Sequence, residues 1–461
     1  MPSSAGAADE GRLPTCLILG GILEGFAAAL LLHLHGSKKT QKKASYIRIV
    51  DKFLILPQSD TYLKWVHPEA RKVLKEGYEH KAVEYVQANI AIPETRTKVF
   101  KAPIASGTED RAFDIVFDFT AGNVTSGSTE EVMVQTAAKQ AKLLGLEALK
   151  YGGVGAYVRM VDPFVTQPRK KCPLREDDVN AKPTSLWSKW HWEGSRALAD
   201  LKDLNIVLAR IANPWGPASL IGVTRRLTIA SVYAYLGPSE TLEFLWGKEL
   251  TLEHVHMADL ASAFYELAQW MRLGAGSRAK ADELAGEDLP GARPAAVPKD
   301  EDGQAEGQFD DIEIEGLVER ERLVRAPLFN VTDGSGQTQE DIGKIIAKAL
   351  GIKVDYYSAI TNTLAKMNMT EVVEAADEKH TEPWLEMLSA SRTPVSNTPL
   401  SPILPPQILR KNRCHLDGSK MNRLIPAWRP KYPKITVDEV KECIVVWKKD
   451  GIWPDVKPKK K

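Results

Sequence analysis

Cysteine is scarce in this chain, with only four among 461 residues. None forms a Cys-x-x-Cys pair or lies beside a histidine at the spacing of a metal site, so we expect no metal centre. The pattern predicts free thiols in a reducing compartment, which we take to be the cytoplasm. The four are Cys16, Cys172, Cys414 and Cys443.

An excess of charge of one sign is also lacking. The formal net charge is +1, which gives no overall attraction to nucleic acid or to a membrane surface. The basic stretch Lys457-Pro-Lys-Lys-Lys461, within a predicted tail of residues 456–461, is expected to be solvated. Residues 1–12 show no basic region followed by an apolar one, so we expect no signal peptide and a disordered N-terminus.

No uninterrupted hydrophobic run is long enough to suggest a membrane span. Residues 16–34 come nearest, but Glu24 and several glycines interrupt them. A break between a strand at 15–19 and a helix from about 23 to 35 explains this stretch better. We therefore expect a small-molecule substrate, with neither nucleic acid nor membrane as partner, and we leave a homodimer open.

The break itself is a glycine turn, Gly20-Gly21-x-x-x-Gly25-x-Ala27. Gly21 permits a tight turn, Gly25 allows close approach of a phosphate, and Ala27 keeps the helix near the sheet. The helix N-terminus then offers free N–H groups to a pyrophosphate. An ordinary strand–turn–helix is the competing interpretation.

The next strand strengthens the dinucleotide interpretation because residues 46–51 read as a buried strand that ends in Asp51. A carboxylate there can accept both ribose hydroxyls of an adenosine and would repel a 2′-phosphate. The spacing from the glycines exceeds the usual about 20 residues, and the basic loop at 36–43 accounts for the excess. The pattern predicts NAD, in preference to NADP.

Strands and helices alternate through the first half of the chain. Alternation with continuous apolar strands predicts an α/β protein with a Rossmann-type, doubly wound parallel sheet and a smaller C-terminal substrate lobe. The strands are expected at 83–87, 113–119, 156–160, 205–210 and 328–332, and the helices at 68–77, 130–144, 185–201, 339–350 and 436–449.

Composition suggests how the chain divides. Residues 13–217 are assigned to an NAD-binding core and 218–273 to part of a second lobe that returns to the core. Residues 274–313 are rich in Ala, Gly, Pro, Asp and Glu without apolar periodicity, which predicts a disordered insertion. Residues 314–455 are assigned to the substrate lobe and C-terminal helices, with an irregular patch at 391–406.

Five separated segments together resemble the extended short-chain dehydrogenase/reductases, the NAD-dependent epimerase/dehydratase family. The resemblance covers about residues 13–273 and returns at 326–455. The segments are Gly20-Gly21-x-x-x-Gly25 with Asp51, Asp114-x-Val116 with Ala121-Gly122, Ser188-Lys189-x-x-x-Glu193, Arg210-Ile-Ala-Asn-Pro-Trp-Gly-Pro217, and Val255-His256-Met-Ala-Asp259-Leu-Ala-x-Ala263.

The resemblance implies roles for particular residues. Arg225 and Arg226 could pair with a substrate phosphate, and the alternative interpretation of residues 220–237 is a helix packed on the sheet. His256 and Asp259 are expected to brace a loop and cap a helix. The implied substrate is a sugar nucleotide, a steroid or a small carbonyl or alcohol, bound by Asn213, Arg225 and Arg226. The implied cofactor site comprises Gly20, Gly21, Gly25, Asp51, Ala121, Gly122, Lys189 and Pro214.

The sequence departs from the family at the reaction centre. Relatives use Tyr-x-x-x-Lys plus a Ser or Thr, with the Tyr as acid/base. Four residues before Lys189 stands Ser185, and the strand end that should offer Ser or Thr reads Met160-Val161-Asp162. The catalytic candidates are therefore Lys189, Ser185, Asp162 and Thr166.

Two classes of function stay open. One is an NAD(H)-dependent epimerase, dehydratase or alcohol oxidoreductase with an atypical acid/base, which family precedent favours. The other is an NAD(H)-binding scaffold or redox sensor without turnover, which Ser185 favours.

Overall fold

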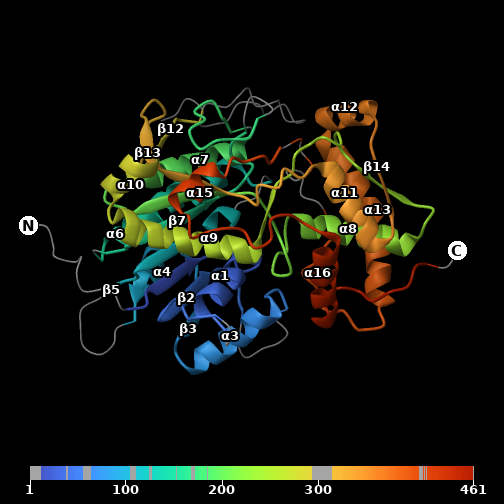
Figure 1. Cartoon of the computed structure of the whole chain (residues 1–461), viewed down its shortest axis with the longest axis horizontal. Coiled ribbons are helices and arrows are strands. Elements are labelled where there is room, and N and C mark those ends of the chain that lie inside the picture. Colours follow the sequence, from blue (N-terminus) through green and yellow to red (C-terminus); the bar gives the residue numbers. More distant parts are fainter. Residues whose placement is uncertain are drawn as a thin grey trace, which may run out of the picture.

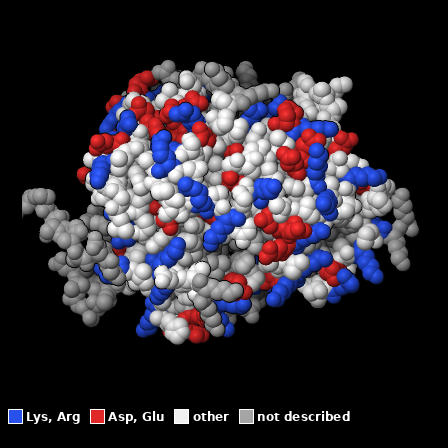
Figure 2. Space-filling model, in the orientation of Figure 1, with Lys and Arg blue, Asp and Glu red and all other residues white. Residues whose placement is uncertain are grey.

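The computed structural model describes residues 12–37, 40–55, 64–103, 111–123, 127–151, 153–167, 172–183, 185–292, 314–403, 409, 411 and 413–459. A central sheet with helices on both faces forms the larger part, and a second lobe lies to its right in Figure 1. Figure 2 shows basic and acidic side chains interspersed over the face in view. No helix among the described residues combines the length and hydrophobicity needed to cross a bilayer.

The central sheet has eight strands in the order β12-β13-β8-β7-β6-β1-β2-β3. Every neighbouring pair is parallel except β12 and β13, which are antiparallel. This confirms the predicted Rossmann-type fold. The strands are β1 (Thr15–Leu19), β2 (Tyr46–Asp51), β3 (Val83–Gln87), β6 (Ile115–Asp118), β7 (Ala156–Val161), β8 (Ile206–Ile211), β12 (Gly286–Leu289) and β13 (Val324–Val331).

Alternate residues of each strand enter two different cores, as the two-residue period of a strand requires. In β1, Cys16 and Ile18 pack on one face, whereas Leu17 and Leu19 pack on the other. Helices α1 (Phe26–His35), α3 (Pro68–Glu79), α9 (Met257–Gln269) and α10 (Arg278–Ala285) cover the first face. Helices α4 (Pro93–Phe100), α6 (Gln140–Leu149) and α7 (Leu186–Ala199) cover the second. Both faces are buried, which explains the apolar strands.

The second lobe has its own core, built around Trp215 and Trp447. Its helices are α8 (Val223–Leu236), α11 (Gln339–Leu350), α12 (Ala359–Met367), α13 (Met369–Ser389) and α16 (Val437–Lys449). A two-stranded parallel sheet joins β10 (Thr241–Phe244) to β14 (Lys353–Tyr356). In Figure 1, helix α8 extends from beside the core across the second lobe, where it packs against α11 and α13.

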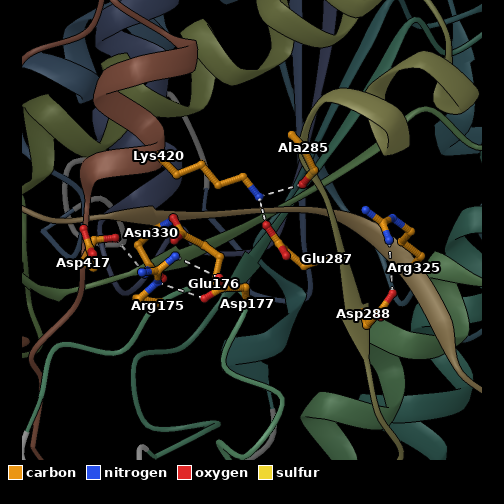
Figure 3. A network of polar contacts seen from close by, with 10 residues as sticks. All are labelled: Arg175, Glu176, Asp177, Ala285, Glu287, Asp288, Arg325, Asn330, Asp417 and Lys420. Carbon is orange, nitrogen blue, oxygen red and sulfur yellow. Dashed lines mark hydrogen bonds and ion pairs between the residues drawn. The ribbon is translucent and has the colours of Figure 1, made fainter.

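The predicted disorder at 274–313 is wrong over residues 278–289, which form α10 and the edge strand β12. Arg278 is buried and donates hydrogen bonds to the carbonyls of Ala199, Leu201 and Leu204. Lys420 ties the end of α10 and β12 together through the Ala285 carbonyl and Glu287 (Figure 3). Composition missed this order because polar side chains provide much of it. Residues 293–313 lie outside the described part.

The assignment of 314–455 to the second lobe also needs correction. Strand β13 pairs in parallel with β8 inside the central sheet, because its run of apolar residues needs burial on both faces. Helix α15 (Ser419–Leu424) packs against this strand, and the Lys420 ammonium lies 5.1 Å from the Phe329 ring centroid. Asn330 of β13 hydrogen-bonds to Glu176 and to the Asp417 carbonyl (Figure 3).

The N-terminus, predicted to be disordered, and the basic tail, predicted to be solvated, are only partly described. Residues 1–11 and 460–461 lie outside the described part. Within the basic tail, Lys459 donates its backbone N–H to the Tyr235 carbonyl and its ammonium to Glu386, 2.7 Å away. The described portion of the tail therefore contacts α8 and α13.

Candidate functional site

The glycine turn lies at the topological switch point of the sheet, where ligands of doubly wound folds bind. Strand β1 has β2 on one side and β6 on the other. Gly20 and Gly21 have φ angles of 72° and 77°, which L side chains rarely adopt. A β-carbon on Gly21 would be 2.8 Å from Cβ of Phe119, at the end of β6. Glycine is needed here because the turn passes so close to the neighbouring strand.

Gly25 is also in the left-handed region, with φ at 98°, but its close neighbour is not a ligand. A β-carbon there would lie 1.8 Å from the Ala218 carbonyl oxygen. The Leu220 N–H also donates to the Glu24 carbonyl at 3.3 Å. The segment after β8 thus rests directly on the glycine turn. This contact explains Gly25 structurally, while its place beside a pyrophosphate stays a prediction.

Asp51 points back toward the same turn. It is 4% exposed, and its Oδ2 accepts a hydrogen bond from the Ile22 N–H at 3.2 Å. Burial raises the pKa of this carboxyl, and its backbone hydrogen bonds oppose that rise. On the other side of β1, Ala121 and Gly122 lie in the short 3-10 helix η1 (Thr120–Asn123) that follows β6. The predicted adenosine-side residues therefore flank the switch point.

A cavity of about 610 Å³ opens between the carboxyl ends of the strands and the second lobe. Its volume falls in the range of about 300–1,000 Å³ typical of small-molecule sites. Glu24 and Phe26 of the glycine turn form part of its wall. Seven predicted site residues line it: Ala121, Asp162, Ser185, Asn213, Pro214, Arg225 and Arg226. The predicted residues Gly20, Gly21, Gly25, Asp51, Thr166 and Lys189 are not part of this lining.

Ser185 is the N-cap of α7. Its hydroxyl accepts the Ser188 N–H at 3.2 Å, and the Ser188 hydroxyl accepts the Ser185 N–H at 2.9 Å. This reciprocal capping box satisfies two N–H groups at the helix start. The capping box explains why serine is favourable here, at the position where the epimerase/dehydratase family has tyrosine.

Lys189 lies one turn into α7 and is 2% exposed. Its ammonium is 3.6 Å from Glu130 Oε1 and 4.4 Å from the Trp190 ring centroid. Glu130 begins α5 (Glu130–Met133) and also accepts a hydrogen bond from Trp190 Nε1 at 2.8 Å. The structure therefore places the predicted catalytic lysine in a buried ion pair outside the cavity wall.

Asp162 follows β7 and reaches the cavity, where burial raises its pKa to about 6. Its Oδ1 accepts the Phe164 N–H at 2.9 Å, which partly offsets that rise. Thr166 is 1% exposed, and its hydroxyl has no hydrogen-bond partner among the described residues. Of these two candidates, only Asp162 faces the cavity.

Arg225 and Arg226 occupy the first turn of α8, at the cavity wall. Arg225 donates to the Ile403 carbonyl at 3.0 Å, and Arg226 Cζ lies 5.8 Å from the Phe244 ring centroid. Arg225 Nε and Arg226 Nη1 are buried without a hydrogen-bond partner in the described part of the chain. Burial lowers the Arg226 pKa to about 10.

Glu24 and His254 are among the cavity residues that the sequence motifs did not identify. Burial raises the Glu24 pKa to about 7, with Arg225 among the charges that oppose this rise. Burial, followed by the charge of Arg226, lowers the His254 pKa to about 3. The signal for Glu24 was present, since it is the acid that interrupts an apolar run.

His256 and Asp259 behave as expected of structural residues. His256 Nδ1 accepts the Ala258 N–H at 3.2 Å at the start of α9. The Asp259 carboxylate accepts the N–H groups of Lys431 and Tyr432, each at 2.9 Å. The four cysteines are unpaired, and no cluster of His, Cys, Asp or Glu suited to a metal occurs among the described residues.

No protein-family model matches the sequence, and no curated protein is significantly similar to it. Solved structures match the fold. The Bordetella bronchiseptica enzyme WbmG in complex with NAD and UDP is 13% identical, with a TM-score of 0.53 over 98% of this chain and 99% of that one. A dTDP-glucose 4,6-dehydratase, DesIV of Streptomyces venezuelae with NAD and TYD bound, is 12% identical, with a TM-score of 0.51 over 95% and 98%. An epimerase of Methanothermobacter thermautotrophicus is 14% identical, with a TM-score of 0.53 over 95% and 94%. At this identity the likeness shows the fold, which is the one the sequence resemblance implied.

Proposed function

We propose that this protein is an NAD(H)-dependent enzyme of the epimerase/dehydratase type, with its substrate in the cavity between the two lobes. One observation carries the proposal. Residues from five distant segments, Glu24, Asp162, Ser185, Asn213 and Arg226, line a single cavity that reaches the glycine turn at the switch point. Two structures of the same fold contain NAD together with a nucleotide, UDP in WbmG and TYD in DesIV.

The residues at the switch point fit the adenosine half of NAD. Gly20 and Gly21 bring the backbone of the turn close to the end of β6, and Asp51 presents a carboxylate at the end of β2. In our proposal, Asp51 accepts the ribose hydroxyls, and Ala121 and Gly122 border the adenosine. When bound, NAD supplies reversible hydride acceptance from a substrate alcohol.

The protein's own part in the reaction is to hold and move a proton at the substrate oxygen. Asp162 and Glu24 suit this role because both line the cavity and their pKa values, about 6 and about 7, lie near neutrality. Asn213 and Arg226 would orient the substrate. Ser185 offers only a short hydroxyl already engaged in helix capping.

A catalytically silent NAD(H)-binding protein is the second candidate, and two observations favour it. Ser185 serves as a helix cap where relatives need a phenol, and Lys189 is paired with Glu130. A cytoplasmic location and a homodimer stay predictions from the sequence under either function.

The test combines binding with turnover. NAD⁺ and NADH are titrated calorimetrically, and the nicotinamide absorbance is then followed with panels of sugar nucleotides, steroids and small alcohols. The enzyme proposal expects binding and a substrate-dependent absorbance change that Asp162→Asn or Glu24→Gln lowers by about 10²–10⁴-fold. Binding without turnover on any class would support the silent protein, and absence of NAD(H) binding would overturn both.

A further inference from the structure

We infer that the cavity binds an amphipathic anion. This ligand has a carboxylate or phosphate head group, which lies at Arg226 and His254, and a long apolar body. This inference rests on the proposed function, in which the cavity is the substrate site, and it names the substrate class. Two features of the cavity lead to it: an anion-binding end with unpaired donors, and an extended apolar wall.

The anion-binding end is the start of α8. A helix N-terminus carries a partial positive charge, and acidic side chains are favourable there. The first turn of α8 instead holds no acidic residue and two arginines, and its N-cap, Gly222, provides no side-chain hydrogen bond. Three positive contributions thus meet at one place. A bound anion would relieve their mutual repulsion.

Unpaired donors at this end point to a missing partner. Arg226 makes no ion pair with any carboxylate in the described part of the chain, and its Nη1 is buried. His254, on β11 (His254–His256), is 2% exposed and lines the same cavity, and its Nδ1 has no hydrogen-bond partner among the described residues. Buried polar groups in folded proteins are normally hydrogen-bonded. An anionic head group would accept from Arg226, and from His254 in the tautomer that protonates Nδ1.

Glu24, an acidic residue of the cavity wall, is not the anionic partner of Arg226. The charge of Glu24 acts on Arg225, not on Arg226, and Arg225 also donates to the Ile403 carbonyl. The nearby ionisable group that acts on Arg226 is the phenol of Tyr356, which is neutral near pH 7. Arg226 is therefore the guanidinium left for a ligand.

Much of the remaining wall is apolar, although Glu243, Gln339, Lys379 and His380 also line it. The apolar side chains come from α8, β10, the segment after β10, and α13 of the second lobe. A sugar carries hydroxyls on most of its carbons, and burying them against this apolar part would leave hydrogen bonds unmade. An apolar chain or ring system would instead gain free energy in proportion to the apolar surface removed from water. The residues are Ile229, Leu242, Phe244, Trp246, Leu250 and Val372.

The test compares ligands that carry the anionic head group, the apolar body, or both. Dodecyl phosphate and dodecanoate carry both the anion and the apolar body, dodecanol carries only the body, and UDP carries only a phosphate-bearing polar part. Calorimetric titrations below micelle-forming concentrations should show dodecyl phosphate or dodecanoate binding at least about tenfold more tightly than dodecanol and UDP. The stronger of the two anions identifies the head group. Dodecanol binding equally well, or UDP binding more tightly, would overturn the inference.

Variants then locate the contact. Arg226→Gln should weaken binding of the amphipathic anion about 10- to 100-fold, as expected for lost charge-assisted hydrogen bonds. Val372→Gln should also weaken binding of the amphipathic anion, because it places a polar side chain in the apolar wall of the cavity. Arg392→Gln, the matched change at an exposed arginine paired with Asp455, should have no effect. Unchanged binding in a folded Arg226→Gln protein would overturn the assignment.

Titration of NAD⁺ in the same proteins separates this inference from the proposed function. If NAD⁺ fails to bind while the amphipathic anion binds through Arg226, the site stands and the proposed enzyme class falls. If NAD⁺ binds and neither anion does, the proposed function survives and the inferred substrate class is wrong.

Discussion

The Ala218 carbonyl oxygen lies 1.8 Å from the position that a β-carbon on Gly25 would take. The glycine turn and the segment after β8 are thereby packed backbone to backbone, at the junction of the core and the second lobe. Any side chain at Gly25 must push that junction apart.

Gly25→Ala is therefore expected to lower the free energy of unfolding by more than backbone strain alone. Gly276→Ala is the matched control, because Gly276 is also left-handed, with φ at 74°, and a β-carbon there meets nothing within 4 Å. Backbone strain should lower the free energy of unfolding of the control by about 1–2 kcal/mol. Overpacking should lower that of Gly25→Ala by about 1–3 kcal/mol more. Urea unfolding of both variants measures the difference. Equal losses would show that the junction yields without cost.

Glu24 should give the protein a specific pH dependence. Burial raises its pKa from 4.5 to about 7, so between these values the native state binds the proton more tightly than the unfolded chain does. The resulting stability is fully present below pH 4.5 and is lost as the pH rises through about 7. Glu24→Gln lacks this loss. The difference in free energy of unfolding between Glu24→Gln and wild type should therefore shift in favour of the variant as the pH rises from acidic to alkaline. The expected shift is about 1–2 kcal/mol, after allowance for the partial exposure of Glu24.

Urea unfolding at about pH 5 and about pH 8 checks this prediction. Glu340→Gln, which removes an exposed carboxylate paired with Lys344, provides the control and should show no comparable change. A constant difference between Glu24→Gln and wild type at both pH values would mean that Glu24 titrates normally in the folded protein.

The buried pair of Lys189 and Glu130 should behave as a structural unit. Lys189→Met leaves the Glu130 carboxylate buried without its cation and is expected to cost about 3–5 kcal/mol of stability. Adding Glu130→Gln removes the uncompensated charge and should recover part of the loss. Because the Lys189 ammonium is buried and paired with Glu130, we expect the NAD⁺ affinity of the folded double variant to change little. A loss of affinity beyond tenfold would instead assign Lys189 to the nicotinamide ribose.

Ser185 should contribute to stability through its cap. Ser185→Ala is expected to cost about 1 kcal/mol, whereas Ser185→Thr keeps the hydroxyl and should cost less. Ser185→Tyr loses the cap and adds a phenol to the cavity wall. We expect no gain in turnover from it, because the lysine that would lower the phenol pKa is paired with Glu130. A clear gain on an identified substrate would show that the pair opens when cofactor binds.

The sequence predicted the fold well because its signals were local. Strand β2 was predicted with its observed bounds, since an apolar run ending in Asp51 is unambiguous. The region 278–289 was missed because it is held by distant polar partners, such as Lys420 for Glu287 and the carbonyls around Arg278. Those partners are separated in sequence, and no local pattern reveals them.

Local sequence signals also identified some of the residues that line the cavity. Motifs identified Asp162, Asn213 and Arg226, which the fold brings to one wall. Two features escaped prediction because they depend on packing between segments: the contact of Ala218 with Gly25 and the pairing of Lys189 with Glu130.

Calorimetric titration decides whether the switch point binds NAD(H) with Asp51 at the ribose. NAD⁺ and NADP⁺ are titrated into wild type and Asp51→Ala. We predict that wild type prefers NAD⁺, and that Asp51→Ala weakens NAD⁺ binding by about 1–3 kcal/mol and removes the preference. Equal or tighter binding of NADP⁺ by wild type, or no binding of either dinucleotide, would contradict the account.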